Sequence, residues 1–203
     1  FQDQLAQMMR DKVKFGVSAY LQIRTCWLDD CVEAFVRKHT CTKSGIANVN
    51  VVILGAGFDT RCYRMNLAER GVQLYEVDSS GTQAMKRGVF TDAGFDAKAI
   101  TFLSCNFEEE DWLEKLESAG FDANLPTFLV WEGVTMYISK QTVEATIKKV
   151  GVLAKGSMIG FDYLDRTWAL SESLAKISKR GREPWIFGMT GTEPEALLEK
   201  CNK

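Results

Sequence analysis

The residues whose types and spacing best suit chemistry are two glycines and an acidic side chain on neighbouring predicted strands. Gly55 and Gly57 follow the apolar run 49–54, and glycines at such a point let the backbone turn tightly from a strand into a helix. Asp78 ends a second apolar run about 20 residues further on, the separation at which an acidic side chain binds ribose hydroxyls. Glu76 is the weaker candidate for that role. The pattern therefore indicates a site for a cofactor that contains a nucleoside.

Asp59 helps to decide between two classes of cofactor. A dinucleotide fingerprint has a third glycine where Thr60 stands, and its pyrophosphate binds at the N-terminus of the following helix. The Asp59 carboxylate would repel that phosphate, whereas it would attract the ammonium group of a phosphate-free cofactor. The loop therefore favours S-adenosylmethionine and makes a nicotinamide oxidoreductase improbable. The alternative interpretation is that Asp59 and Thr60 only cap the helix.

Three more polar side chains are candidates for the same site. Asn106 follows the apolar run 99–105, and Glu132 ends the run 127–132. The carboxyl ends of parallel strands form the edge where ligands bind in open α/β sheets. Arg24 falls among apolar and aromatic residues of a predicted helix. It is either a surface arginine with its stem on the core or a guanidinium that binds a carboxylate.

Five apolar runs alternate with helical patterns and must position these residues. Strands are expected at 49–54, 72–78, 99–105, 127–132 and 157–163. Helices are expected at 3–15, 20–38, 60–70, 81–91, 108–118, 139–153, 165–180 and 193–203. This alternation predicts an α/β fold with a doubly wound, mostly parallel Rossmann-like sheet. We expect a single domain over residues 1–203, in which 1–45 form a helical cap and 46–203 form the core.

Composition excludes several classes of protein. The 203 residues carry a net charge of −2, without the basic excess of a nucleic-acid-binding protein. No apolar run approaches the ~18 residues of a membrane span. The single histidine, His39, argues against a metal site or a histidine-based catalytic triad.

The cysteines and the first residue bear on the compartment. Six cysteines without a C-x-x-C pair indicate reduced thiols and a cytoplasmic, reducing compartment. An organelle is not excluded, because the chain starts at Phe1 inside a helical pattern and a targeting segment would precede it.

Four separated motifs resemble the leucine carboxyl methyltransferase family, a branch of the class I S-adenosylmethionine-dependent methyltransferases. The motifs lie at 54–61, 75–78, 126–137 and 160–163 and occur in the family's order. The resemblance extends from about residue 15 to residue 190. It implies methyltransferase activity with S-adenosyl-L-methionine as the cofactor, in agreement with the interpretation of Asp59.

Residue chemistry and the resemblance together predict eight cofactor-binding residues: Arg24, Gly55, Gly57, Asp59, Asp78, Asn106, Phe107 and Glu132. The resemblance implies that Arg24 holds the methionine carboxylate, that Glu132 faces the methionine ammonium and that Asp78 binds the ribose hydroxyls. It also implies that the two glycines line the methionine and ribose.

Two positions depart from the family pattern. The resemblance places Asn106 and Phe107 beside the adenine, where the family usually has aspartate in place of Asn106; an amide oxygen can still accept from the adenine amino group. Ser79 stands where a proline commonly follows the strand-two aspartate.

The expected reaction is methyl transfer to a carboxylate or other oxygen nucleophile of a small molecule or peptide. Methyl transfer is an in-line displacement, so the protein must align the nucleophile and exclude water. A carboxylate acceptor needs no general base. A hydroxyl or amine acceptor would need one, for which Asp162 and Tyr163 are the nearest candidates; no catalytic residue is assigned. Tyr137 and Tyr163 are expected to border the acceptor pocket.

The resemblance also bears on the end of the sheet. Sheets of this class close with a sixth and a seventh strand, whereas this sequence ends at Lys203 before either. Strand five is therefore expected to be an open edge and a candidate docking site for a protein partner. The same observation supports an alternative function, a catalytically silent methyltransferase-fold subunit with a structural role in a larger complex.

Overall fold

The computed structural model describes residues 2–171 and 184–199, with side chains described at residue 16 and from residue 18 onward. Five parallel strands form one sheet in the order β3-β2-β1-β4-β5. The strands are β1 (Asn50–Leu54), β2 (Gln73–Asp78), β3 (Ile100–Ser104), β4 (Thr127–Trp131) and β5 (Met158–Phe161). The order reverses direction between β1 and β4, which makes the sheet doubly wound and confirms the predicted α/β class.

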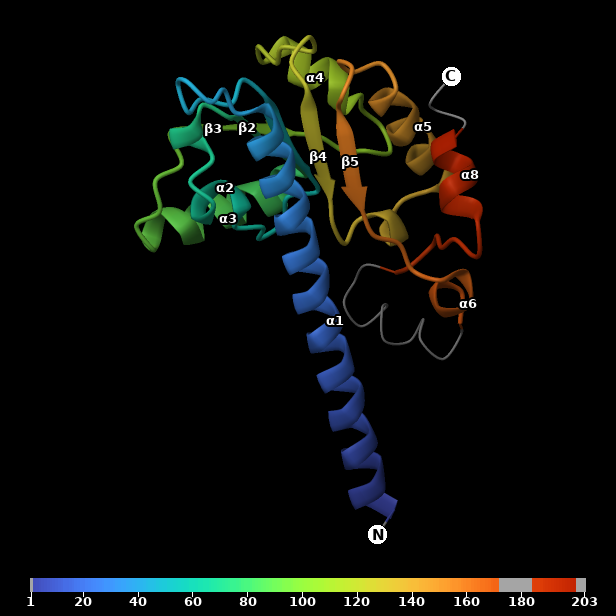
Figure 1. The fold of residues 1–203 in the computed structure, drawn as a ribbon. Helices are drawn as coiled ribbons and strands as arrows, with labels where there is room; N and C mark the ends of the chain where they lie inside the picture. Colours follow the sequence, from blue (N-terminus) through green and yellow to red (C-terminus); the bar gives the residue numbers. More distant parts are fainter. Residues whose placement is uncertain (1, 172–183, 200–203) are drawn as a thin grey trace.

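Helices connect these strands. They are α1 (Gln2–His39), α2 (Arg61–Arg64), α3 (Ser80–Asp92), α4 (Trp112–Ser118), α5 (Lys140–Val150), α6 (Arg166–Ala169) and α8 (Glu193–Glu199), with 3-10 turns η1 (Ala68–Arg70) and η2 (Thr135–Tyr137). Figure 1 shows the C-terminal part of α1 against the sheet and its backbone continuing past the ends of β4 and β5. The helix α1 is thus placed to contribute side chains at that edge of the sheet.

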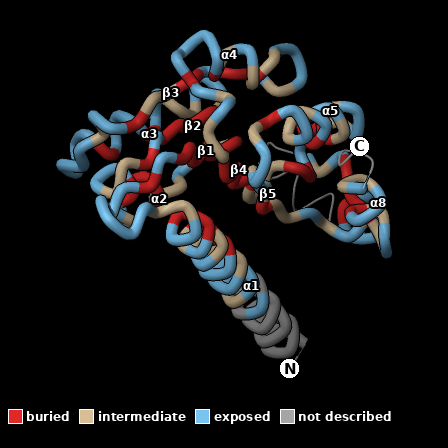
Figure 2. The backbone as a smooth tube through the Cα atoms, turned by 45° about the horizontal axis from the view of Figure 1, so that its top comes forward, coloured by how far each residue is buried: buried red, intermediate tan, exposed pale blue. Residues whose placement is uncertain are grey.

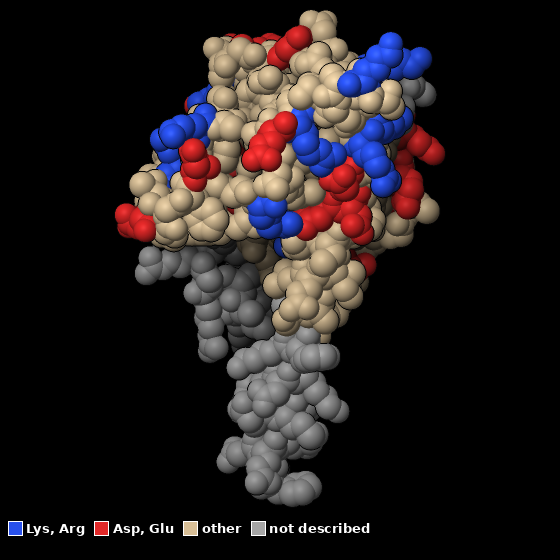
Figure 3. Space-filling view, turned by 60° about the vertical axis from the view of Figure 1, so that its left-hand side comes forward, with Lys and Arg blue, Asp and Glu red and all other residues tan. Residues whose placement is uncertain are grey.

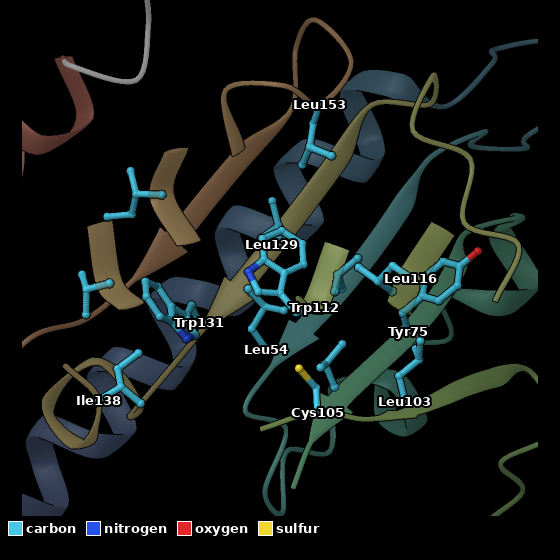
Figure 4. Close-up of a cluster of buried hydrophobic side chains, with 14 of the residues drawn as sticks. Leu54, Tyr75, Leu103, Cys105, Trp112, Leu116, Leu129, Trp131, Ile138 and Leu153 are labelled. Atoms are coloured by element: carbon cyan, nitrogen blue, oxygen red, sulfur yellow. The ribbon is translucent and has the colours of Figure 1, made fainter. Parts of the chain in front are cut away.

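Alternating strand residues supply two cores, one on each face of the sheet. Val52 and Leu54 of β1 belong to a cluster with side chains of α4 and α5, whereas Val51 and Ile53 belong to a cluster with α1. Figure 2 shows the buried positions concentrated along the strands. Figure 4 shows the first cluster, in which the rings of Trp112 and Trp131 lie among leucines. Burial on both faces explains why the strands are almost continuously apolar.

Four expected helix ranges differ from the structure. The expected helices 3–15 and 20–38 are one continuous helix, α1, because Gly16 between them is tolerated within it. The expected helix 60–70 is broken at Asn66, which has a φ of +50°. The acidic run 108–111 precedes its helix instead of opening it, and the last of these residues, Asp111, caps α4 by accepting two backbone N–H groups.

β5 lies at one edge of the sheet. β5 pairs with β4, and within residues 2–171 and 184–199 it has no strand on its other side, as predicted. Parts of the expected helices 165–180 and 193–203 lie outside the described residues. Among the helices that the structure describes, none has the length and apolar character required to cross a membrane.

Candidate functional site

The parallel register brings the predicted polar residues to one edge of the sheet. Leu54 pairs with Val77, so Gly55 follows β1 at the level where Asp78 ends β2. Trp131 pairs with Phe161, so the residues that follow these strands, Glu132 and Asp162, are also neighbours. In Figure 1 the arrowheads of β4 and β5 point toward this edge, beside α1. The predicted convergence at the carboxyl edge is confirmed.

The loop after β1 requires its two glycines. Gly55 has a φ of +68° and Gly57 a φ of +39°, a region that side chains other than glycine rarely adopt. A Cβ atom on Gly55 would collide with the side chain of Val134. The Gly55 N–H donates to the Val77 carbonyl at 2.8 Å, which ties the loop to β2.

Asp78 is bound to the glycine loop. One carboxylate oxygen accepts the Gly57 backbone N–H at 2.5 Å, and the other accepts the Ser79 N–H at 2.6 Å. Asp78 is partly exposed, so lone pairs on both oxygens can still accept from a ligand. The carboxylate is therefore fixed in orientation beside the loop, as a ribose-binding group must be.

A network of buried and half-buried ion pairs lies between the loop and α1. Its members, which we call the ion-pair network, are Arg24, Asp29, Asp59, Arg61, Glu132 and Asp162. Arg61 is at its centre with 1% of its side chain exposed. Its guanidinium pairs with Asp59, with Asp29 at 2.7 Å and with Glu132 at 2.7 Å. Arg61 thereby joins the glycine loop, α1 and the end of β4.

Arg24 is held by two carboxylates. Its Nε donates to Glu132 at 2.7 Å, and one terminal nitrogen donates to Asp162 at 2.7 Å. Thr25 also donates its hydroxyl to Glu132 at 2.9 Å, and the Gly133 N–H donates to Asp162 at 2.5 Å. Both partners are carboxylates of the protein itself, so the predicted role of Arg24 toward the cofactor's carboxylate stays a prediction.

The alternative interpretation, that Asp59 and Thr60 cap the helix, holds for Asp59 but not for Thr60, whose side chain makes no capping bond. The Asp59 carboxylate accepts the backbone N–H of Arg61 at 2.7 Å and also pairs with the Arg61 guanidinium. A pyrophosphate at the start of α2 would have to displace this carboxylate. The arrangement is consistent with a phosphate-free cofactor.

Two pockets meet at this site. The glycine-loop pocket has a volume of about 370 Å³ and is lined by residues 55–61 together with Arg24, Thr25, Glu132 and Gly133. The aromatic pocket has a volume of about 790 Å³, and Tyr20, Tyr137, Tyr163, Trp168 and Trp185 contribute rings to its wall. Arg24 and Gly133 line both pockets. Two ligands bound there would lie side by side.

Of the remaining predicted residues, two line a pocket, and Asn106 and Phe107 line neither of the two pockets. Tyr137 and Tyr163, which were predicted to border an acceptor pocket, line the aromatic pocket. Asn106 lies two residues beyond the end of β3 and is exposed, with its side-chain oxygen accepting the Glu108 N–H at 3.1 Å. Phe107 is half-buried against the core and does not line the glycine-loop pocket.

Sequence reasoning assigned no role to Arg61 or Asp29 and treated Asp162 only as a possible base. Arg61 is the last residue of the motif at 54–61. Its position two residues after Asp59 could have indicated an ion pair between them. Asp29 lies 32 residues from Arg61, and no local pattern connects the two.

Figure 3 shows basic and acidic side chains interspersed on a face of the molecule rather than gathered by sign.

The network makes stability depend on pH. Burial alone would raise the pKa of Glu132, but the Arg61 guanidinium and the hydrogen bonds from Arg24 and Thr25 lower it below its ordinary value. A carboxyl group whose pKa is lower in the folded state stabilises the fold above its unfolded pKa, and this contribution is lost as the pH falls through the folded value. We expect the free energy of unfolding, measured with urea, to fall between about pH 6 and about pH 3.

A Glu132→Gln variant isolates the contribution of this residue. Its free energy of unfolding should vary less steeply over the same pH range than that of the unsubstituted chain. The matched control is Glu117→Gln, which changes an exposed residue of α4 and should leave the slope unchanged. Equal slopes for Glu132→Gln and the unsubstituted chain would show that Glu132 titrates alike in the folded and unfolded states.

Comparison with known proteins gives one family and one fold. The sequence profile of the leucine carboxyl methyltransferase family matches residues 2–151. A candidate S-adenosyl-L-methionine-dependent methyltransferase of Streptomyces coelicolor is 33% identical over 159 residues, which cover 78% of this chain and 52% of that protein. A second candidate of the same description, from Bacillus subtilis, is 32% identical over 73% of this chain and 51% of its own length. The chain spans about half the length of these relatives.

The fold recurs in a solved methyltransferase. The structure of phosphoethanolamine N-methyltransferase 2 from Haemonchus contortus, in complex with phosphomonomethylethanolamine and S-adenosylhomocysteine, superposes with a TM-score of 0.55. The two sequences are 18% identical, and the match covers 83% of this chain and 35% of that one. At this identity the likeness shows a shared fold.

Proposed function

The chain belongs to the leucine carboxyl methyltransferase family, and we propose that it binds S-adenosyl-L-methionine and transfers its methyl group to an oxygen nucleophile. The acceptor is a carboxylate or other oxygen of a small molecule or peptide. The observation that carries the proposal is the meeting of the glycine-loop pocket and the aromatic pocket at Arg24 and Gly133. A methyl donor in the first would have its acceptor in the second.

The charges of the glycine-loop pocket suit the amino-acid part of this cofactor. A free α-amino acid is a zwitterion, and the pocket wall carries Arg24 and Arg61 beside Glu132. In the proposal Arg24 binds the carboxylate of the cofactor and exchanges part of its contact with Glu132 and Asp162 for it. Glu132 then accepts the ammonium group. Asp59, which is paired with Arg61, acts on that ammonium through its charge.

The nucleoside part is assigned to the other strand ends. Asp78 accepts the ribose hydroxyls while Gly57 keeps the carboxylate in place through its N–H. The glycines leave room for a ligand close to the backbone. Asn106 and Phe107 border the adenine, with Asn106 offering an amide oxygen to its amino group.

The bound cofactor would supply an electrophilic methyl group on a sulfonium. The side chains here have no covalent chemistry to perform in such a transfer, and their tasks are to position both partners and to exclude water. Tyr137 and Tyr163, which line the aromatic pocket, hold the acceptor. The open edge of β5 stays a predicted docking site for a protein partner.

Calorimetric titration of the purified chain tests the proposal directly. S-adenosylmethionine and S-adenosylhomocysteine should both bind with dissociation constants in the micromolar range, because both carry the adenosine and amino-acid groups that the site recognises. NAD is the matched control, since its pyrophosphate would meet the Asp59 carboxylate, and it should give no binding. Absence of heat with both adenosyl ligands, from a chain shown to be folded, would favour the structural-subunit alternative.

A further inference from the structure

Arg24 lies between the two pockets, and its guanidinium has to keep one orientation when its partners change. Its side chain extends from α1 and lines both the glycine-loop pocket and the aromatic pocket. Glu132 and Asp162 each accept from one of its nitrogens at 2.7 Å. In the proposed function, the carboxylate of the cofactor takes over part of these contacts. A contact that uses none of the N–H donors of Arg24 would hold the guanidinium through that exchange.

Tyr20 makes a contact of this kind. It lies four residues before Arg24 on α1, a spacing that places two side chains next to each other on one face of a helix. The Cζ atom of Arg24 lies over the Tyr20 ring, 5.6 Å from the ring centroid. This distance is within the ~6 Å at which the face of an aromatic ring attracts a cation. The contact occupies none of the five N–H donors of the guanidinium, which stay available to carboxylates.

The Tyr20 hydroxyl reaches one of the carboxylates that hold Arg24. It donates to Oδ2 of Asp162 at 3.3 Å, and the same oxygen accepts from Arg24 at 2.7 Å. Burial and the Asp162 carboxylate raise the pKa of Tyr20 above its ordinary value, so the hydroxyl keeps its proton at neutral pH. The hydrogen bond is long and exposed to solvent, and hydrogen bonds of this kind contribute little. The ring is therefore the main contact of Tyr20 with this group of charges.

We propose, on the premise of the methyltransferase function above, that Tyr20 is a positioning residue for the cofactor and acts through Arg24. Its ring holds the guanidinium in place while the carboxylate partners of Arg24 exchange. Tyr20 lines the aromatic pocket and not the glycine-loop pocket, so it acts without touching the cofactor. One ring thus serves both pockets, as a support for Arg24 and as part of the wall beside the acceptor.

A pair of ligands separates this role from a general effect on the fold. S-adenosylhomocysteine carries the amino-acid part that Arg24 is proposed to bind, whereas 5′-methylthioadenosine has the adenosine without it. In calorimetric titration, Tyr20→Leu should weaken S-adenosylhomocysteine binding about 5-fold, the upper end for an exposed cation–π contact, because the Arg24 side chain is only 17% exposed. The affinity for 5′-methylthioadenosine should stay unchanged. A general loosening of α1 would not distinguish the two ligands in this way.

A conservative variant and a matched control accompany Tyr20→Leu. Tyr20→Phe keeps the ring and removes only the hydroxyl, so its affinity for S-adenosylhomocysteine should lie within about 2-fold of that of the unsubstituted chain. Trp27→Leu replaces another aromatic residue of α1, 53% exposed against 46% for Tyr20, that lines neither pocket. It should change neither affinity. Circular dichroism verifies that each variant folds.

The Arg24→Ala background tests whether Tyr20 acts through Arg24. Residues that act as one unit show losses that do not add. With the guanidinium absent, Tyr20→Leu should therefore cause no further loss of S-adenosylhomocysteine affinity. Losses that add in the double variant would show that Tyr20 acts independently of Arg24 and would overturn the inference.

The remaining outcomes separate the inference from its premise. If the unsubstituted chain binds S-adenosylhomocysteine but Tyr20→Leu leaves that affinity unchanged, or weakens both ligands equally, Tyr20 has no positioning role and the methyltransferase proposal stands. A loss in Tyr20→Phe equal to that in Tyr20→Leu would overturn the ring contact as the cause. Failure of S-adenosylhomocysteine to bind the unsubstituted chain would overturn the methyltransferase proposal and this inference with it.

Discussion

Arg61→Met is expected to lower the free energy of unfolding by about 3–5 kcal/mol, the usual effect of removing one partner from a buried ion pair. Methionine fills a similar length of the buried volume but carries no charge. Asp59, Asp29 and Glu132 would lose their shared cation, and burial would make that loss costly. Urea unfolding followed by tryptophan fluorescence at neutral pH measures the change.

The matched control is Arg64→Met, three residues further along the chain. Arg64 also pairs with Asp29 at 2.7 Å, but 40% of its side chain is exposed. Ion pairs that solvent reaches contribute little, so this variant should lose no more than about 1 kcal/mol. Similar losses in the two variants would contradict the central role of Arg61 and would attribute the effect to Asp29 alone.

The fold could be predicted from the sequence because its signals are local. Each strand is a short, mostly apolar run, and the central strands β1, β2 and β4 are buried on both faces of the sheet. Helix continuity was harder to predict. The helix α1 passes through Gly16 without interruption, whereas the helix after β1 breaks at Asn66, and local composition does not distinguish these two outcomes.

The candidate site shows the same difference between features with a local sequence signal and features without one. The proximity of Gly55 and Asp78 could be predicted because each ends or follows a strand, and parallel register brings strand ends together. The network around Arg61 was not found, because its partners at Asp29 and Glu132 lie 32 and 71 positions away in the sequence, on either side of Arg61. The packing of α1 against the sheet brings Asp29 to Arg61, and the pairing of β4 with β1 brings Glu132 there. Ion pairs of this kind are properties of the assembled fold.

Asp78→Ala is expected to weaken S-adenosylhomocysteine binding by at least about 100-fold, because hydrogen bonds to a charged group contribute about 1.5–3 kcal/mol each and two ribose hydroxyls would lose their acceptor. The substitution also leaves the Gly57 N–H without the carboxylate that now accepts it at 2.5 Å. The loop would therefore lose both a ligand contact and part of its own order. Calorimetric titration of the folded variant measures the loss.

Comparison with Arg24→Ala shows which half of the ligand each residue binds. 5′-Methylthioadenosine keeps the ribose and adenine of the cofactor but lacks its amino-acid part. Asp78→Ala should weaken the binding of both ligands by similar factors, whereas Arg24→Ala should weaken only S-adenosylhomocysteine. Asp96→Ala, a change at an exposed carboxylate paired with Lys98, should alter neither affinity. If Asp78→Ala left 5′-methylthioadenosine binding intact, Asp78 would have no contact with the ribose, and its role would be confined to holding Gly57 in the loop.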